Sequence, residues 1–96
     1  MRGNNEHSLK DAIQQLVKTY KIEGKLNEVK LINSWARLMG PMIAHRTGEL
    51  SIRDKKLFVK LTSAPLREEL NMARPKIISM LNAEAGAEVI VEIIFQ

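Results

Sequence analysis

The chain has 96 residues, no cysteine, 45% hydrophobic residues and a formal net charge of +4 at pH 7. This length predicts a single domain with one modest core, and the lack of cysteine excludes a disulfide framework and a thiolate metal site. There is no apolar run long enough to span a membrane and no signal peptide. We therefore expect a cytoplasmic protein without a membrane segment.

The charge is distributed unevenly along the chain. Residues 1–60 contain twelve Lys and Arg against six Asp and Glu, a balance of +6, whereas residues 61–96 contain three against five, a balance of −2; the two sum to +4. Lysine and arginine beside phosphates release condensed counterions, so a basic region favours a polyanionic partner. A generic basic protein would give the same totals, so charge alone does not identify the partner.

The first predicted element is a helix over residues 9–23, after a polar segment, residues 1–8, that we expect to be a flexible tail. Ser8 is its expected N-cap and Gly24 its expected end. Its apolar residues recur with the 3.6-residue period of a helix. They are Leu9, Ala12, Ile13, Leu16, Val17 and Tyr20. We interpret this helix as an addition to a single domain, the whole spanning residues 9–96.

A second helix is predicted over residues 26–44, around the only tryptophan of the chain. Apolar residues fill one half of its surface, from Leu26 and Val29 onwards, and Trp35 lies at the centre of that half. Trp35 could stack on a base or anchor a partner, but its central position favours a core residue. Pro41, which follows a glycine, predicts a kink or a helix end with a short new turn.

At Thr47 the hydrophobic period changes from 3.6 to 2, which indicates strands. Two antiparallel strands are predicted on either side of a short turn at residues 54–55, and a third strand over residues 88–96. The inner face of the sheet is expected to hold Leu50, Ile52, Leu57, Val59, Leu61, Val89, Val91, Ile93 and Phe95. The outer face is expected to show Arg53, Lys56, Phe58, Lys60, Ile90, Glu92 and Ile94.

Between the second and third strands, a helical segment is predicted from Ser63, its N-cap, to Gly86. Its apolar face continues in phase across Pro75, which predicts one kinked helix or two coaxial pieces rather than a loop. The order α-α-β-β-α(kinked)-β predicts an α+β two-layer domain, with helices packed on one face of a small mixed three-stranded sheet. The expected core includes Trp35, Met39, Ile43, Leu57, Val59, Leu70, Val91 and Ile93.

The sequence contains no catalytic, cofactor-binding or metal-binding motif such as a P-loop or a G-x-G-x-x-G. Glu68 and Glu69 are adjacent, but neighbouring helical residues point about 100° apart and do not converge. His45 is interpreted as a surface or capping histidine. We therefore expect no enzyme activity, no cofactor and no metal.

The outer sheet face offers a candidate binding surface. Phe58 between Lys56 and Lys60 is an arrangement with which single-stranded nucleic acid is bound, since bases stack on the ring and phosphates meet the ammonium groups. A protein-partner or self-association surface, or cover by the first helix, are alternatives that stay open. The candidate nucleic-acid contacts are Arg53, Lys55, Lys56, Phe58, Lys60, Arg74 and Lys76.

An ordered set of residues across positions 26–96 resembles the DciA family, the bacterial loaders or operators of the replicative helicase. The set comprises Trp35, Gly40, Ile43, Ala44, Thr47, Leu50, Leu57, Val59, Ser63, Leu66, Leu70, Leu81, Asn82, Gly86, Val89, Ile93 and Phe95. The resemblance implies a KH-like domain, a role in DNA replication, binding of single-stranded or structured DNA, contact with the hexameric helicase, and no enzyme activity.

The predicted order from residue 26 agrees with a KH-like domain of the prokaryotic type, α-β-β-α-α-β, if the third helical segment is counted as two pieces. A KH domain that binds nucleic acid carries a Gly-x-x-Gly loop between its paired helices, whereas residues 72–76 contain no glycine. The alternatives to a helicase adaptor are a KH-like RNA-binding module and a protein–protein or self-association domain. A homo-oligomer is compatible with each of them.

Overall fold

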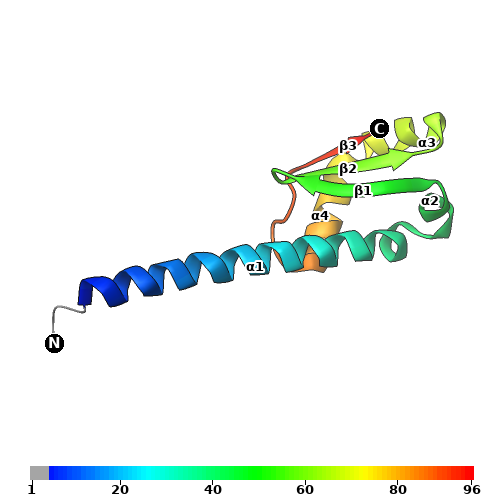
Figure 1. Cartoon of the computed structure of the whole chain (residues 1–96). Helices are drawn as coiled ribbons and strands as arrows, with labels where there is room; N and C mark the ends of the chain where they lie inside the picture. Colours follow the sequence, from blue (N-terminus) through cyan, green and yellow to red (C-terminus); the bar gives the residue numbers. More distant parts are fainter. Residues whose placement is uncertain (1–4) are drawn as a thin grey trace.

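A computed structural model describes the backbone of residues 5–96 and the side chains of residues 8–96. A long helix carries a small sheet and further helices at its C-terminal end, and its N-terminal part extends away from them (Figure 1). The elements are α1 (Asn5–Met39), α2 (Pro41–His45), β1 (Thr47–Arg53), β2 (Lys56–Leu61), α3 (Ala64–Met72), α4 (Arg74–Ala85) and β3 (Glu92–Phe95). Residues 1–4 of the expected tail lie outside the described residues, and residues 5–8 are helical.

α1 corrects the predicted helices over residues 9–23 and 26–44, because it runs without interruption from Asn5 to Met39. Ser8 is therefore not an N-cap, and Gly24 does not end a helix. Glycine inside a helix costs only about 1 kcal/mol relative to alanine. It ends a helix where its backbone turns left-handed, as at Gly86, which caps α4 with φ +78°.

The break after α1 occurs at Gly40, where φ is +91°. Pro41 then begins the short helix α2, a position that suits proline because its missing N–H would have no partner in the first turn. The predicted helix end followed by a short new turn is confirmed.

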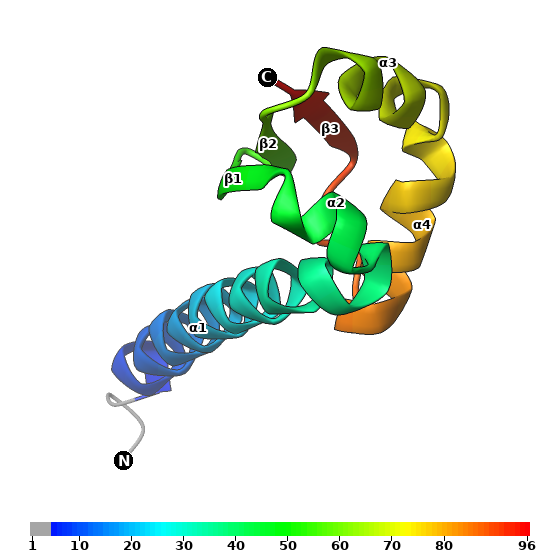
Figure 2. The same cartoon turned by 90° about the vertical axis from the view of Figure 1, so that its right-hand side faces the viewer.

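The sheet has the order β1-β2-β3 and confirms the predicted α+β class. β1 and β2 are antiparallel, whereas β2 and β3 are parallel, with α3 and α4 forming the crossover between them. α2, α3 and α4 lie on the same side of the sheet, and α1 passes beneath it (Figure 2). The fold is thus a layer of helices against one face of a mixed sheet.

The third helical segment confirms part of the prediction and corrects the rest. Ser63 caps α3, since its hydroxyl accepts a hydrogen bond from the backbone N–H of Leu66 at 3.3 Å. α3 and α4 are separated by Ala73 alone, so there is no extended loop. The break falls before Pro75 rather than at it, because proline fits the first turn of a new helix. The two helices also run in different directions and are not coaxial (Figure 2).

β3 begins at Glu92, later than the predicted residue 88, and this changes two side chains. Val91, predicted in the core, is 53% exposed, whereas Ile90, predicted on the outer face, is fully buried. Strict alternation holds only where a strand pairs with its neighbour, and the register of β3 with β2 starts at Glu92. The segment before it follows a course set by other contacts.

Trp35 lies in the core, with 2% of its surface exposed. Its indole N–H donates a hydrogen bond to the hydroxyl of Thr47 at 3.0 Å, and that hydroxyl donates to the carbonyl of Ile43 at 2.7 Å. These two hydrogen bonds meet at the Thr47 hydroxyl and therefore join α1, α2 and β1. Of the other expected core residues, Leu57, Val59, Leu70 and Ile93 are buried, and Met39 and Ile43 are partly buried.

Replacing Trp35 with alanine should lower the free energy of unfolding by about 3–5 kcal/mol, as truncation of a large buried aromatic does. Thr47→Val keeps the volume but leaves the indole N–H without its acceptor, so it should cost about 1–3 kcal/mol. Urea denaturation measures both. A Trp35→Ala protein as stable as the original chain would contradict the core assignment.

Gly24 gives a second prediction, because a Cβ added there would have no heavy atom within 4 Å. Gly24→Ala should therefore stabilise α1 locally by about 1 kcal/mol through helix propensity alone. Hydrogen exchange of the amides around Gly24 should slow by about fivefold. Exchange that stays unchanged or accelerates would show that α1 is not continuous at this position.

Candidate nucleic-acid interface

The register of the sheet places most of the predicted outer-face residues together. Phe58 on β2 pairs with Ser51 on β1 and with Ile94 on β3, and these side chains face away from the inner residues. Lys56 pairs with Arg53 on one side and with Glu92 on the other. Within the described chain no helix, α1 included, lies over this face (Figure 2), so cover by the first helix is ruled out.

Arg53 affects how a base could stack on the Phe58 ring. Its guanidinium carbon lies 4.4 Å from the centre of the Phe58 ring, a cation–π contact. An incoming base must then stack on the exposed side of the guanidinium plane or displace it from the ring. Both are compatible with single-stranded nucleic acid, because bases stack on arginine planes as well as on aromatic rings. The sequence predicted the ring but not this contact.

The hairpin turn presents a further cation beside this face. Asp54 and Lys55 adopt φ values of +51° and +62°, so both central residues of the two-residue turn are left-handed, as in a type I′ hairpin. Lys55 is exposed and lies 3.9 Å from the Glu88 carboxylate. An exposed pair at this distance is weak, so the ammonium group remains accessible to a phosphate.

Arg74 and Lys76 are not brought together with the hairpin. They begin α4 at the corner between α3 and α4, which lies on the helical side of the sheet and far from the β1–β2 turn (Figures 1 and 2). Arg74 donates a hydrogen bond to the side-chain oxygen of Asn71 at 3.3 Å. The predicted nucleic-acid contacts therefore divide into a set on the sheet and a pair at the corner.

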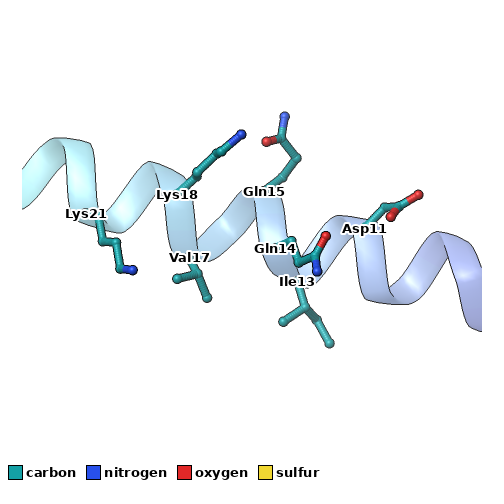
Figure 3. A pocket seen from close by; sticks show the side chains of 7 residues that line it. All are labelled: Asp11, Ile13, Gln14, Gln15, Val17, Lys18 and Lys21. Carbon is teal, nitrogen blue, oxygen red and sulfur yellow. The ribbon is translucent and has the colours of Figure 1, made fainter.

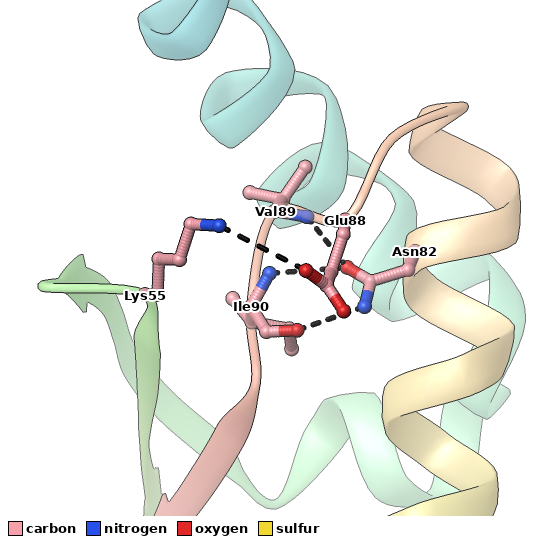
Figure 4. A network of polar contacts seen from close by, with 5 residues as sticks. All are labelled: Lys55, Asn82, Glu88, Val89 and Ile90. Carbon is pink, nitrogen blue, oxygen red and sulfur yellow. Dashed lines mark hydrogen bonds and ion pairs between the residues drawn. The ribbon is translucent and has the colours of Figure 1, made fainter.

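The segment that leads into β3 is held by the side chain of Asn82 (Figure 4). Its amide oxygen accepts from the backbone N–H groups of Val89 and Ile90, at 3.0 and 3.1 Å, and its amide nitrogen donates to the Ile90 carbonyl at 2.8 Å. The backbone N–H of Val91 then donates to the Lys55 carbonyl at 2.8 Å. Asn82 thereby positions the hairpin turn relative to β3.

Asn82→Ala should destabilise the protein by about 2–4 kcal/mol, because it leaves partly buried backbone groups of Val89 and Ile90 without partners. Urea denaturation measures the loss. Asn71→Ala is a matched control, since it removes an amide that bonds only to the exposed Arg74 side chain, and surface changes usually stay within about 0.5 kcal/mol. Equal losses for the two variants would contradict the role of Asn82.

Sequence reasoning missed the exposure of the N-terminal half of α1. Every side chain from Ser8 to Leu26 is exposed, although its apolar residues have the period of a buried face. Leu26 and Val29, expected on the covered half of the second helix, are 61% and 54% exposed. A shallow groove runs along this single helix, and Ile13, Val17 and Lys21 help to line it (Figure 3).

The described residues offer neither a metal site nor a membrane span. They contain no group of three or more His, Asp or Glu side chains able to hold a metal ion. The helices of the described part also include none that is long and apolar enough to cross a membrane.

Nearly the whole chain resembles the model of a known family. The model of the family described as "Dna[CI] antecedent, DciA" matches residues 8–95, nearly the whole chain. No curated protein and no solved structure matches the chain. The match includes the exposed half of α1, which the resemblance recognised in residues 26–96 did not.

Proposed function

Because the chain belongs to the DciA family, whose members have a helicase-loading role in DNA replication, we propose that it is a non-catalytic adaptor that binds DNA and contacts the replicative helicase in the bacterial cytoplasm. The DNA contact is assigned to the outer sheet face and the hairpin turn. The observation that carries this assignment is the uncovered face on which Arg53, Lys56 and Lys60 surround Phe58.

The spacing of this face suits a single strand. Side chains two residues apart on a strand are separated by about 6.6 Å, so Lys56 and Lys60 lie roughly 13 Å apart with Phe58 between them. Two phosphates can meet the two ammonium groups while a base lies over the Arg53–Phe58 stack. Lys55, at the end of the hairpin, extends the same track.

The expected binding is weak and largely independent of sequence. Lysine ammonium groups act as point charges toward phosphates and carry no information about the bases. Stacking tolerates every base, because each has a π-face. Glu92, opposite Lys56, lowers the positive potential of the face and favours modest affinity.

The other interpretations of the sequence have less support. RNA binding of the KH type needs a glycine loop that grips phosphates with its backbone, whereas Ala73 is the only residue between α3 and α4. Self-association through the outer face needs exposed apolar area. Phe58 and Ile94 are half-buried and Ile90 is fully buried, so little such area is present. With α1 and the five-residue α2 counted as one element, the observed order α-β-β-α-α-β is that of a KH-like domain of the prokaryotic type.

Removing Lys56 and Lys60 together should flatten the salt dependence of single-strand binding by about 1.4 units of log–log slope, since each phosphate contact contributes about 0.7. Titration of a labelled single strand at several salt concentrations measures the slope. Phe58→Ala should weaken binding by about 1–3 kcal/mol and leave the slope unchanged.

Arg74→Ala/Lys76→Ala is the matched control, because it removes the same charge from the corner between α3 and α4. It should leave the slope close to that of the original chain. If the corner variant flattens the slope and the Lys56→Ala/Lys60→Ala variant does not, the DNA face is at the corner and the assignment to the sheet is wrong.

A further inference from the structure

Five large side chains form an uncovered stripe along the N-terminal half of α1. We define the apolar stripe as Leu9, Ile13, Leu16, Val17 and Tyr20, which follow the 3.6-residue period of one helix face. Between 47% and 65% of the surface of each is exposed. In Figure 3, Ile13 and Val17 point to one side of the helix, and Lys18 and Gln15 point to the other.

The apolar stripe continues the face by which α1 packs on its own domain. Ile13 and Leu31 are 18 residues apart, as are Val17 and Trp35, and 18 residues make five turns of 3.6, or about 27 Å along the axis. Leu31 and Trp35 are buried, with 0% and 2% of their surface exposed. α1 therefore repeats its docking face beyond the edge of the domain, with nothing of the described chain against it.

An amphipathic helix gains most of its stability from packing of its apolar face rather than from helix propensity. The N-terminal half of α1 lacks that packing and also contains Gly24, which lowers its intrinsic stability. A partner that covers the apolar stripe would supply the missing contacts and stabilise the helix at the same time.

The charges beside the apolar stripe favour a partner other than a second copy. Residues 8–26 contain four lysines against one aspartate and one glutamate, a balance of +2. The lysines Lys10, Lys18, Lys21 and Lys25 fall within about 80° of one another on the helical wheel, next to the Val17 edge of the stripe. Two copies would bring like charges together, whereas carboxylates on a partner would meet this row.

The size of the stripe also favours a partner other than a second copy of this chain. Five half-exposed side chains bury roughly 500 Å² against a flat partner, less than the ~800 Å² per partner of a stable interface. A groove that also encloses the lysine stems buries more. One turn beyond Tyr20, on the same face of α1, Gly24 lines a small groove together with Lys55 and Glu88. A partner on the stripe that also enters this groove would reach the hairpin.

We propose that the apolar stripe is the surface by which this chain docks into an apolar groove of the replicative helicase, with carboxylates along one rim of that groove. The proposal rests on the proposed function, in which the helicase is the protein partner. It adds the place of contact and the chemistry of the partner's surface.

The test uses the full chain and the purified replicative helicase of the same bacterium, both treated with nuclease, in a binding titration. Leu16→Gln/Tyr20→Gln replaces two stripe residues with a good helix former and should weaken binding by about 100-fold, tenfold for each anchor of about 1.4 kcal/mol. Lys18→Glu/Lys21→Glu should weaken it by about tenfold or more, since like charges would meet at the rim.

Ile22→Gln is the matched control. Ile22 is 58% exposed, like the stripe residues, but it lies nine residues, or 2.5 turns, from Ile13 and therefore on the opposite side of α1. The affinity of the Ile22→Gln variant for the helicase should stay within about twofold of that of the original chain. All the exchanged side chains are exposed, so the variants should keep the thermal unfolding of the domain, which circular dichroism measures.

The outcomes separate the two proposals. If the original chain does not bind the helicase, the helicase contact in the proposed function is wrong. If the original chain and Leu16→Gln/Tyr20→Gln bind equally, the function stands and the stripe is not the docking surface. The stripe proposal is also overturned if that variant alters only the mass of the free chain by light scattering, or only its binding to phosphatidylglycerol vesicles.

Discussion

The hydrogen-bonded packing of Trp35 is the interaction on which the rest of the fold depends. Its indole N–H reaches Thr47 at the first residue of β1, and Thr47 returns a hydrogen bond to Ile43 in α2. The direction in which the chain leaves α1 is therefore fixed by a side chain of α1 itself. β1 in turn sets the register of β2, and β2 sets that of β3.

Much of the fold could be predicted, because the relevant patterns are local. The alternation in β2 predicted Leu57 and Val59 on the inner face and Lys56, Phe58 and Lys60 on the outer face. The burial of the side chains in β2 follows this alternation. Ser63 and Pro41 marked helix starts for reasons of backbone chemistry that act within one turn. These features need no knowledge of what lies across the core.

The predictions from sequence were wrong or incomplete where the local structure depends on distant contacts or on small differences in free energy. Gly24 has only a small cost inside a helix, so its presence could not show whether α1 ends there. The alternation around Val91 failed because Asn82, from α4, holds the neighbouring backbone out of the strand. The cation–π contact of Arg53 and the separation of Arg74 from the hairpin depend on tertiary positions that no local pattern contains.

The exposed half of α1 shows why periodicity alone does not identify a core. A 3.6-residue apolar pattern states that a helix face will be covered, but not by which molecule. One continuous apolar face runs along α1. The rest of the domain covers this face at Leu31 and Trp35 but leaves it exposed at Ile13 and Val17. Because the helix is continuous, a partner on the stripe is held in a fixed direction from the domain. The groove at Gly24 and Lys55 joins that partner to the hairpin that we assign to DNA, so the two proposed contacts would adjoin along one surface.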